Sequence, residues 1–209
     1  MVSSDNELNY WPSFVDLMSS IFIVILIIFF ILFLSQQYLS YLVSKGENDL
    51  IELRNLVSQK EIEGVRVNSD GRITIGEKVL FSPGQHILTV KGKYTVENIG
   101  KILRDFLRQE RKRKFSVIVE GHTDTKASSE FNLDLSFRRA KEVTDFWQRW
   151  LKFGVETDSL LDIFPAGYGE NRLYTYTKDE VSNESNRRVE IRVVPKFDEM
   201  LSEILKTRH

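Results

Sequence analysis

Residues 115–125 read FSVIVEGHTDT, an apolar run that is followed by a short polar segment. The first part, residues 115–121, is rich in β-branched and aromatic side chains and predicts a strand. The polar residues GHTDT end this strand and place a histidine, two threonines and a carboxylate together. The stretch therefore predicts a central strand with a candidate site directly after it.

Helical and extended patterns alternate on both sides of this strand. Residues 95–111 and 133–153 have apolar side chains at helical spacing and predict two amphipathic helices. Further strands are predicted at GRITI (71–75), LLDIFPAGYG (160–169) and RRVEIRVV (187–194). Strands that alternate with helices predict the α/β class, here a sandwich of one sheet with helices on a face.

A long apolar segment precedes this domain. Residues 17–34 are interrupted only by two serines, which is long enough for a helix that crosses a membrane. Their apolar side chains favour insertion by roughly 5–10 kcal/mol. Trp11 and Tyr38 flank the segment as interfacial aromatic residues do. We expect a retained membrane helix over residues 14–43, after a short N-terminus of residues 1–13.

The remaining chain divides into three parts. Residues 44–64 contain a short amphipathic pattern and are expected to form a juxtamembrane linker helix. The α/β domain is expected over residues 65–195, followed by a C-terminal tail over residues 196–209. The sequence does not show whether this linker helix also blocks a path for ions across the membrane.

Composition excludes several kinds of function. The net charge of −1 argues against direct binding of nucleic acid. The chain has no cysteine, which excludes disulfides, thiolate metal sites and a cysteine nucleophile. Glu120, His122 and Asp124 suggest a hydrolase cluster, but no nucleophile or set of metal ligands accompanies them. We therefore expect neither an enzyme nor a bound cofactor or metal.

Four motifs carry a resemblance to a known family. They are VEGHTDT (119–125), FNLDLSFRRAKEV (131–143), AGYGENR (166–172) and NRRVEIRV (186–193). In this order they resemble the OmpA C-terminal-like, peptidoglycan-binding domain, which outer-membrane anchors and the flagellar stator subunit MotB share. The resemblance covers roughly residues 65–195.

This resemblance implies a binding site for the diaminopimelate of the peptidoglycan stem peptide. Asp124 and Arg139 match the family positions that hold it, while Thr123, Asn132 and Arg188 match positions that line the pocket. The chemistry is consistent, because diaminopimelate ends in an ammonium and a carboxylate, and an arginine holds a carboxylate through two parallel hydrogen bonds.

The sequence differs from the family pattern at two positions near this site. The family has glycine where this chain has Ala127, and the proline expected after GYGE is absent. Both differences affect the loops of the pocket more than its charged pair. Alternatively, Asp124 and Arg139 form an internal ion pair that holds no ligand.

A single carboxylate, Asp16, lies just inside the start of the membrane helix, about 7 Å beyond the level of Trp11. Ser13, Ser19 and Ser20 share its face of the helix at positions i−3, i+3 and i+4. A carboxylate at such a place usually faces a partner or a water-filled path. Alternatively, the Asp16 side chain extends to the membrane–water interface, or it caps the start of the helix.

The segment NYWPSFVDLMSS (9–20), joined to an OmpA-like domain, resembles the ZorB family, MotB-like subunits of Zorya anti-phage systems. This resemblance implies that Asp16 carries the coupling ion, for which we expect a proton, although the sequence does not distinguish a proton from sodium. It also implies two copies of this chain, a homodimer, inside a ring of five MotA-like ZorA subunits, with contacts to membrane lipid and peptidoglycan. Cytoplasmic defence effectors would respond indirectly.

The same resemblance implies a location in the bacterial inner membrane, with a cytoplasmic N-terminus and a periplasmic domain. Lys45 weakly favours the opposite orientation, but large domains cross membranes largely regardless of flanking charge. Two other functions stay open: a flagellar MotB-type stator, and a passive envelope tether that binds peptidoglycan without moving ions.

Overall fold

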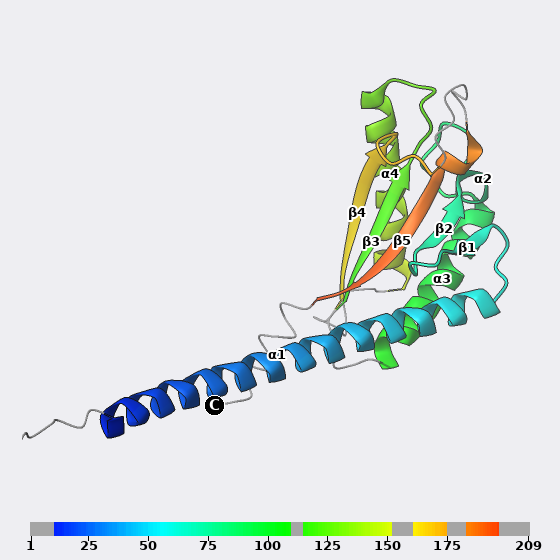
Figure 1. Ribbon diagram of the computed structural model, residues 1–209. Coiled ribbons are helices and arrows are strands. Elements are labelled where there is room, and N and C mark those ends of the chain that lie inside the picture. The colour runs from blue at the N-terminus through cyan, green and yellow to red at the C-terminus, as the bar shows by residue number, and fades with distance from the viewer. Residues whose placement is uncertain (1–10, 110–114, 152–160, 175–182, 197–209) are drawn as a thin grey trace, which may run out of the picture. The chain divides into compact units, whose positions relative to one another are not determined.

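The computed structural model describes residues 11–109, 115–151, 161–174 and 183–196 (Figure 1). The chain divides into two compact units, Met1–Glu47 and Asn48–His209. Helix α1, Trp11–Gln59, contributes its first part to one unit and its last part to the other. The tail expected after residue 196 lies outside the described residues, as does the N-terminus before residue 11.

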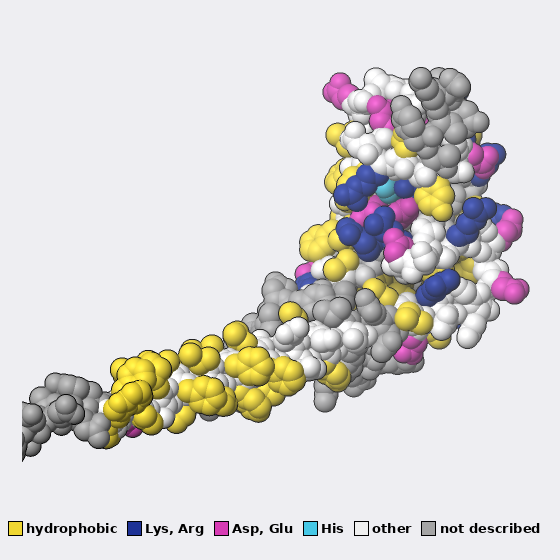
Figure 2. Space-filling model, viewed as in Figure 1, with side chains coloured by type: hydrophobic (Ala, Val, Ile, Leu, Met, Phe, Trp, Pro, Cys, Tyr) yellow, Lys and Arg dark blue, Asp and Glu magenta, His cyan; other side chains and the backbone are white. Residues whose placement is uncertain are grey.

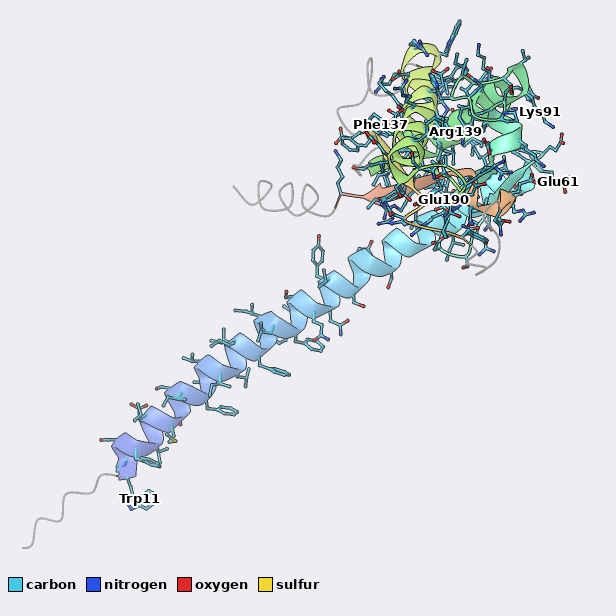
Figure 3. All side chains as sticks on the ribbon, turned by 90° about the horizontal axis from the view of Figure 1, so that it is seen from above. Trp11, Glu61, Lys91, Phe137, Arg139 and Glu190 are labelled. Atoms are coloured by element: carbon cyan, nitrogen blue, oxygen red, sulfur yellow. The ribbon has the colours of Figure 1, made fainter. Side chains whose placement is uncertain are left out.

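The first unit presents an apolar surface to its surroundings. Trp11–Tyr41 is a helical stretch long and apolar enough to cross a membrane, and none of its most apolar window is buried. Hydrophobic side chains cover much of the visible face of this part of α1 (Figure 2) and project from both sides of the helix in a second view (Figure 3). The predicted membrane helix therefore has the surface that a lipid environment requires.

The second unit is built on a mixed sheet whose strand order is β1-β2-β5-β3-β4. Strands β3 and β4 are parallel, and the other neighbours are antiparallel. The strands are β1 (Val65–Val67), β2 (Ile73–Gly76), β3 (Phe115–His122), β4 (Leu161–Gly169) and β5 (Arg188–Pro195). The predicted α/β class is confirmed.

Two long helices accompany the sheet, α3 (Val90–Gln109) and α4 (Ser129–Trp150). Both begin earlier than predicted, because capping residues start them. Thr89 Oγ1 accepts a hydrogen bond from Gly92 N at 2.9 Å, and the Ser128 side chain accepts one from Phe131 N. The short helix α2 (Glu77–Leu80) and the 3-10 turn η1 (Glu184–Asn186) complete the domain.

The hydrophobic core lies between α3, α4 and one face of the sheet. Val117, Val119 and Ile191 point into it from β3 and β5. Leu53 and Val57, from the end of α1, are also buried in this core. The last turns of α1, which we expected to act as a linker, are therefore part of the packing of the domain.

Two glycines allow α4 to approach the sheet closely. A Cβ on Gly121 would lie 2.0 Å from the backbone oxygen of Ser136, and one on Gly167 would lie 2.7 Å from the backbone of Phe137. Both glycines belong to the motifs GHTDT and AGYG. The motifs are thus partly structural, because only glycine leaves room for the helix backbone.

Candidate functional site

A cleft of about 470 Å³ lies where β3 ends, next to α2 and the first turns of α4. Four of the five residues predicted to line the site do so: Thr123, Asp124, Asn132 and Arg139. Arg188 does not, and its neighbour Arg187 lines the cleft in its place. Glu77, from α2, adds a carboxylate that the sequence did not point to.

Four charged side chains of the cleft form one continuous chain of ion pairs. Glu77 contacts Arg139 with one carboxylate oxygen, and its other oxygen lies 2.6 Å from Arg187 Nε. Arg187 Nη1 donates to Asp124 Oδ2 at 2.5 Å. Asp124 and Arg139 are therefore linked through Glu77 and Arg187, which differs from the direct pair considered as an alternative.

Burial and charge act in opposite directions on these arginines. Burial lowers the pKa of Arg139, although the Glu77 carboxylate partly offsets this effect. Burial also acts to lower the pKa of Arg187, but its bonds to Asp124 and Glu77 raise the pKa overall. Both guanidiniums stay charged, since arginine does not lose its proton in proteins. The ion-pair chain thus contains two fixed cations and two carboxylates, and Lys78 and Lys126 add two further cations to the lining of the cleft.

Asn132 shapes the loop that carries Asp124. Its amide nitrogen lies 3.0 Å from Asp124 O, 3.1 Å from Ala127 O and 2.7 Å from a carboxylate oxygen of Glu170. The other oxygen of Glu170 accepts a hydrogen bond from Ser129. Asn132 therefore ties the backbone of this loop, at Asp124 and Ala127, to the start of α4.

Residues 80–187 match the OmpA family, which is more than half of the chain. The chain belongs to the OmpA family. Zorya protein ZorB from Escherichia coli O139:H28 is 25% identical over 207 residues, which cover 91% of this chain and 82% of that protein. The resemblance to ZorB predicted from the sequence is confirmed.

Other relatives share mainly this OmpA-family domain. The peptidoglycan-associated lipoprotein of Pseudomonas putida is 40% identical over 76 residues, 36% of this chain and 42% of that protein. A MotB-like protein from Desulfovibrio vulgaris has a similar fold, with a TM-score of 0.51 at 22% identity, over 74% of this chain and 96% of that chain.

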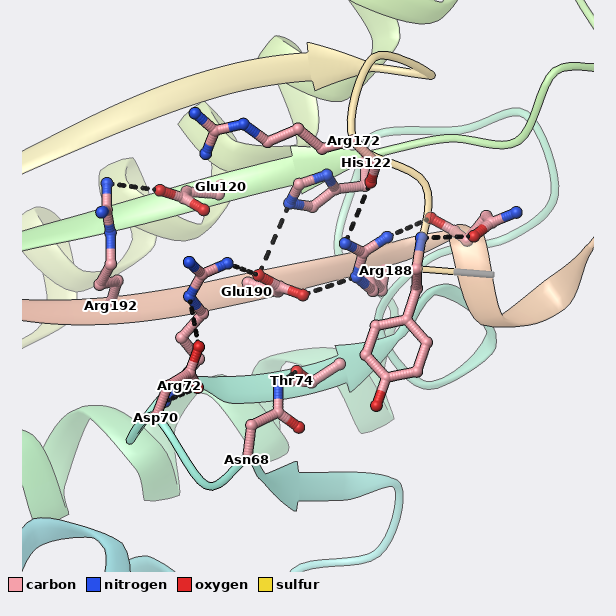
Figure 4. Close-up of polar contacts among 12 residues, drawn as sticks. Asn68, Asp70, Arg72, Thr74, Glu120, His122, Arg172, Arg188, Glu190 and Arg192 are labelled. Carbon is pink, nitrogen blue, oxygen red and sulfur yellow. Dashed lines mark hydrogen bonds and ion pairs between the residues drawn. The ribbon is translucent and has the colours of Figure 1, made fainter. Parts of the chain in front are cut away.

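The OmpA-family sheet carries a second set of charges on the face opposite to α3 and α4 (Figure 4). The strand register places Glu190 beside Glu120, and Arg188 beside His122. Arg188 Nε lies 2.7 Å from Glu190, and Arg72 also contacts Glu190, at 3.1 Å. Arg188, predicted to line the pocket, thus belongs to this outer face.

Glu120, His122 and Glu190 have the spacing of a metal site, since their ligand atoms lie within 4.8 Å of one another. Guanidiniums already pair with both carboxylates, however. Arg192 contacts Glu120 at 2.8 Å, and both Arg188 and Arg72 contact Glu190. Burial, followed by the charge of Arg188, lowers the pKa of His122 to about 4. Because guanidiniums pair with both carboxylates, we interpret this cluster as an ion-pair network.

The hydrolase cluster considered from the sequence is divided between two places. Glu120 and His122 lie on the outer face of the sheet, whereas Asp124 lines the cleft. Two cleft residues were missed. Arg187 directly precedes the predicted Arg188, and side chains alternate between the two faces along a strand, so a shift of one residue exchanged them. Glu77 gave no signal, because its partners are distant in sequence.

Asp16 lies in the membrane helix of the other unit, as the sole charged residue of Trp11–Tyr41. The hydroxyls of the two serines that follow it are satisfied within the helix. Ser19 donates to Val15 O at 2.7 Å, and Ser20 donates to Asp16 O at 2.9 Å. The Asp16 side chain is exposed on the helix surface.

Proposed function

We propose that this chain is a peptidoglycan-anchored, proton-conducting, stator-like motor subunit in anti-phage defence. It would work with a ring of MotA-like subunits around two copies of the chain. The similarity to ZorB supports this function, because the aligned region runs through both the membrane helix and the OmpA-family domain. The peptidoglycan-associated lipoproteins support the anchoring role.

The observation that carries the proposal is the exposed carboxylate of Asp16 on an otherwise apolar helix. A charge in hydrocarbon is costly, so an intramembrane carboxylate is retained where it has a task. Protonation neutralises the carboxylate and changes how the helix packs against its neighbours. A proton that is taken up on one side of the membrane and released on the other drives such a cycle.

A single helix cannot enclose a path for ions, so the proposal requires partner subunits. Apolar side chains surround α1 along its membrane segment, which leaves its whole surface available for other helices and for lipid. The N-terminus would lie in the cytoplasm and the OmpA-family domain in the periplasm. The moving part and the anchored part would then lie on one chain.

The cleft supplies the anchor. An ammonium and a carboxylate on one ligand group match the alternating charges of Asp124, Arg187, Glu77 and Arg139. Such a zwitterion adds no net charge to these four side chains, whose own charges balance. Diaminopimelate is a group of this chemistry, and it is the ligand that the family resemblance implies.

Cosedimentation of the full-length chain with purified peptidoglycan sacculi tests the anchor. We expect Asp124→Asn to reduce binding at least about tenfold, since it removes a charge-assisted contact. The matched control is Asp134→Asn, which removes an exposed carboxylate paired with Arg138 on α4. Equal binding by Asp124→Asn and wild type would exclude the cleft as the anchor.

Two assays separate the alternatives. A flagellar-type stator would restore motility to cells that lack their own stator subunit, whereas a defence motor would reduce plaque formation by phage. A passive tether predicts that plaque formation depends on Asp124 and not on Asp16. The exposed carboxylate favours a motor over a tether, because a tether needs no charge in its membrane helix.

A further inference from the structure

A second cavity, of about 370 Å³, adjoins the cleft on the outer side of the sheet. We call it the cationic groove, and define it by Arg66, Asn68, Thr74, Lys78, Arg187 and Arg188. Lys78 and Arg187 line both cavities. One ligand can therefore reach from the cleft into the groove across these two side chains.

Several side chains of the groove lie outside the residues that match the OmpA family. The family match begins at residue 80. Arg66, Asn68, Thr74 and Lys78 all precede it, on or beside the hairpin of β1 and β2. Arg188 follows the end of the match. The side chains that give the groove its charge thus come mainly from outside the shared domain.

Four cations line the groove, with Glu184 as the carboxylate among the described lining residues. Three of the cations are held by carboxylates. Lys78 pairs with Glu184 at 2.6 Å, Arg188 with Glu190 at 2.7 Å, and Arg187 with the two carboxylates of the cleft. Within the described part of the chain, no carboxylate pairs with Arg66.

The position of Arg66 directs its charge toward the groove. It is exposed on the edge strand β1, and the register places it opposite Thr74 of β2. Asn68 and Thr74 add hydrogen-bonding groups, joined by a bond of 3.2 Å from the Asn68 amide to Thr74 Oγ1. An arginine beside an amide and a hydroxyl is an arrangement that binds a carboxylate.

We propose that the cationic groove binds a second carboxylate of the peptidoglycan stem peptide, beside the diaminopimelate held in the cleft. The glutamate that precedes diaminopimelate is joined through its side chain, so its α-carboxylate is free. Arg66 holds this carboxylate, and Lys78 and Arg187 border its path from the cleft. The inference rests on the proposed function, since it concerns a further part of the same ligand. Arg66 would then distinguish a stem peptide with a free glutamate α-carboxylate from one in which this group is amidated.

The test measures affinity of the full-length chain in detergent for two synthetic tripeptides, L-Ala-γ-D-Glu-diaminopimelate with a free or an amidated glutamate α-carboxyl. Wild type is expected to bind the free acid roughly three- to tenfold more tightly than the amide. Arg66→Gln should lose this difference by weakening binding of the acid alone. The control Lys101→Gln, which removes an exposed cation from α3, should behave as wild type.

The outcomes separate this inference from the proposed function. Equal affinity of wild type for the acid and the amide would contradict the proposed carboxylate binding by the groove, but not the proposed binding of diaminopimelate by the cleft. Equal weakening of both ligands by Arg66→Gln, with an unchanged unfolding midpoint, would also contradict carboxylate binding by the groove. Failure of wild type to bind either tripeptide would overturn the proposed wall anchor, and the groove with it.

Discussion

The carboxylate of Glu77 lies 2.6 Å from the guanidinium of Arg187 and also holds Arg139, so one buried side chain orients both arginines of the cleft. Only 7% of Glu77 is exposed, and its charge has little access to water. Arg187, oriented in this way, forms an ion pair with Asp124. The cleft is therefore arranged before any ligand arrives, which reduces the entropy that binding costs.

Replacing Glu77 by Gln should destabilise the domain by about 2–4 kcal/mol, because it leaves two arginines short of a carboxylate. Urea unfolding of the full-length chain in detergent measures this loss. The control Glu97→Gln removes an exposed carboxylate paired with Lys101 one turn away on α3, and should cost less than about 0.5 kcal/mol. Similar losses in the two variants would show that Glu77 does not organise the cleft.

The close contact between β3 and α4 gives a second prediction. Gly121→Ala would place a methyl group 2.0 Å from the backbone oxygen of Ser136, so the helix must move. We expect a loss of roughly 2–3 kcal/mol in the free energy of unfolding. Gly76→Ala is the matched control, since a Cβ there meets nothing within 4 Å. Equal stability of the two variants would contradict the close packing.

His122 makes stability depend on pH. Its pKa is lowered to about 4, first by burial and then by Arg188, whereas an unfolded histidine has a pKa near 6.5. The unfolded chain therefore binds the proton more readily. Stability should be fully present above pH ~6.5 and fall as the pH is lowered toward 4, by up to about 3 kcal/mol.

His122→Phe tests this dependence, because it keeps an aromatic ring for the stack with Tyr168 at 5.4 Å. Among the described residues, neither ring nitrogen of His122 makes a hydrogen bond, so the substitution removes none. Unfolding free energies at pH 7 and 4.5 should differ less in the variant than in wild type. An unchanged difference would assign the pH dependence to other groups.

Much of the fold followed from the sequence. Strands β3, β4 and β5 were predicted close to their observed bounds, because each joins a run of apolar or alternating residues to a turn signal. The strand β1 was missed, since three residues are too few to show a period. The burial of Leu53 and Val57 was also missed, because an amphipathic pattern does not say which surface it packs on.

The candidate site was predicted in part. The structure brings Asp124 and Arg139, which the resemblance names, to the lining of one cleft, the first from the loop after β3 and the second from α4. It could not predict Glu77, whose role depends on a contact across the fold. The exchange of Arg187 for Arg188 arose because neighbouring residues of a strand face opposite sides, and the sequence gives no absolute register.

We propose that Asp16 carries protons, and a plaque assay with Asp16→Asn tests this role. Cells would express the wild-type or variant chain together with its partner subunits, at equal levels in the membrane. We predict that Asp16→Asn abolishes protection from phage, while Asp16→Glu, which retains a carboxylate, keeps part of it. Full protection by Asp16→Asn would contradict the motor and identify the chain as a wall-binding tether.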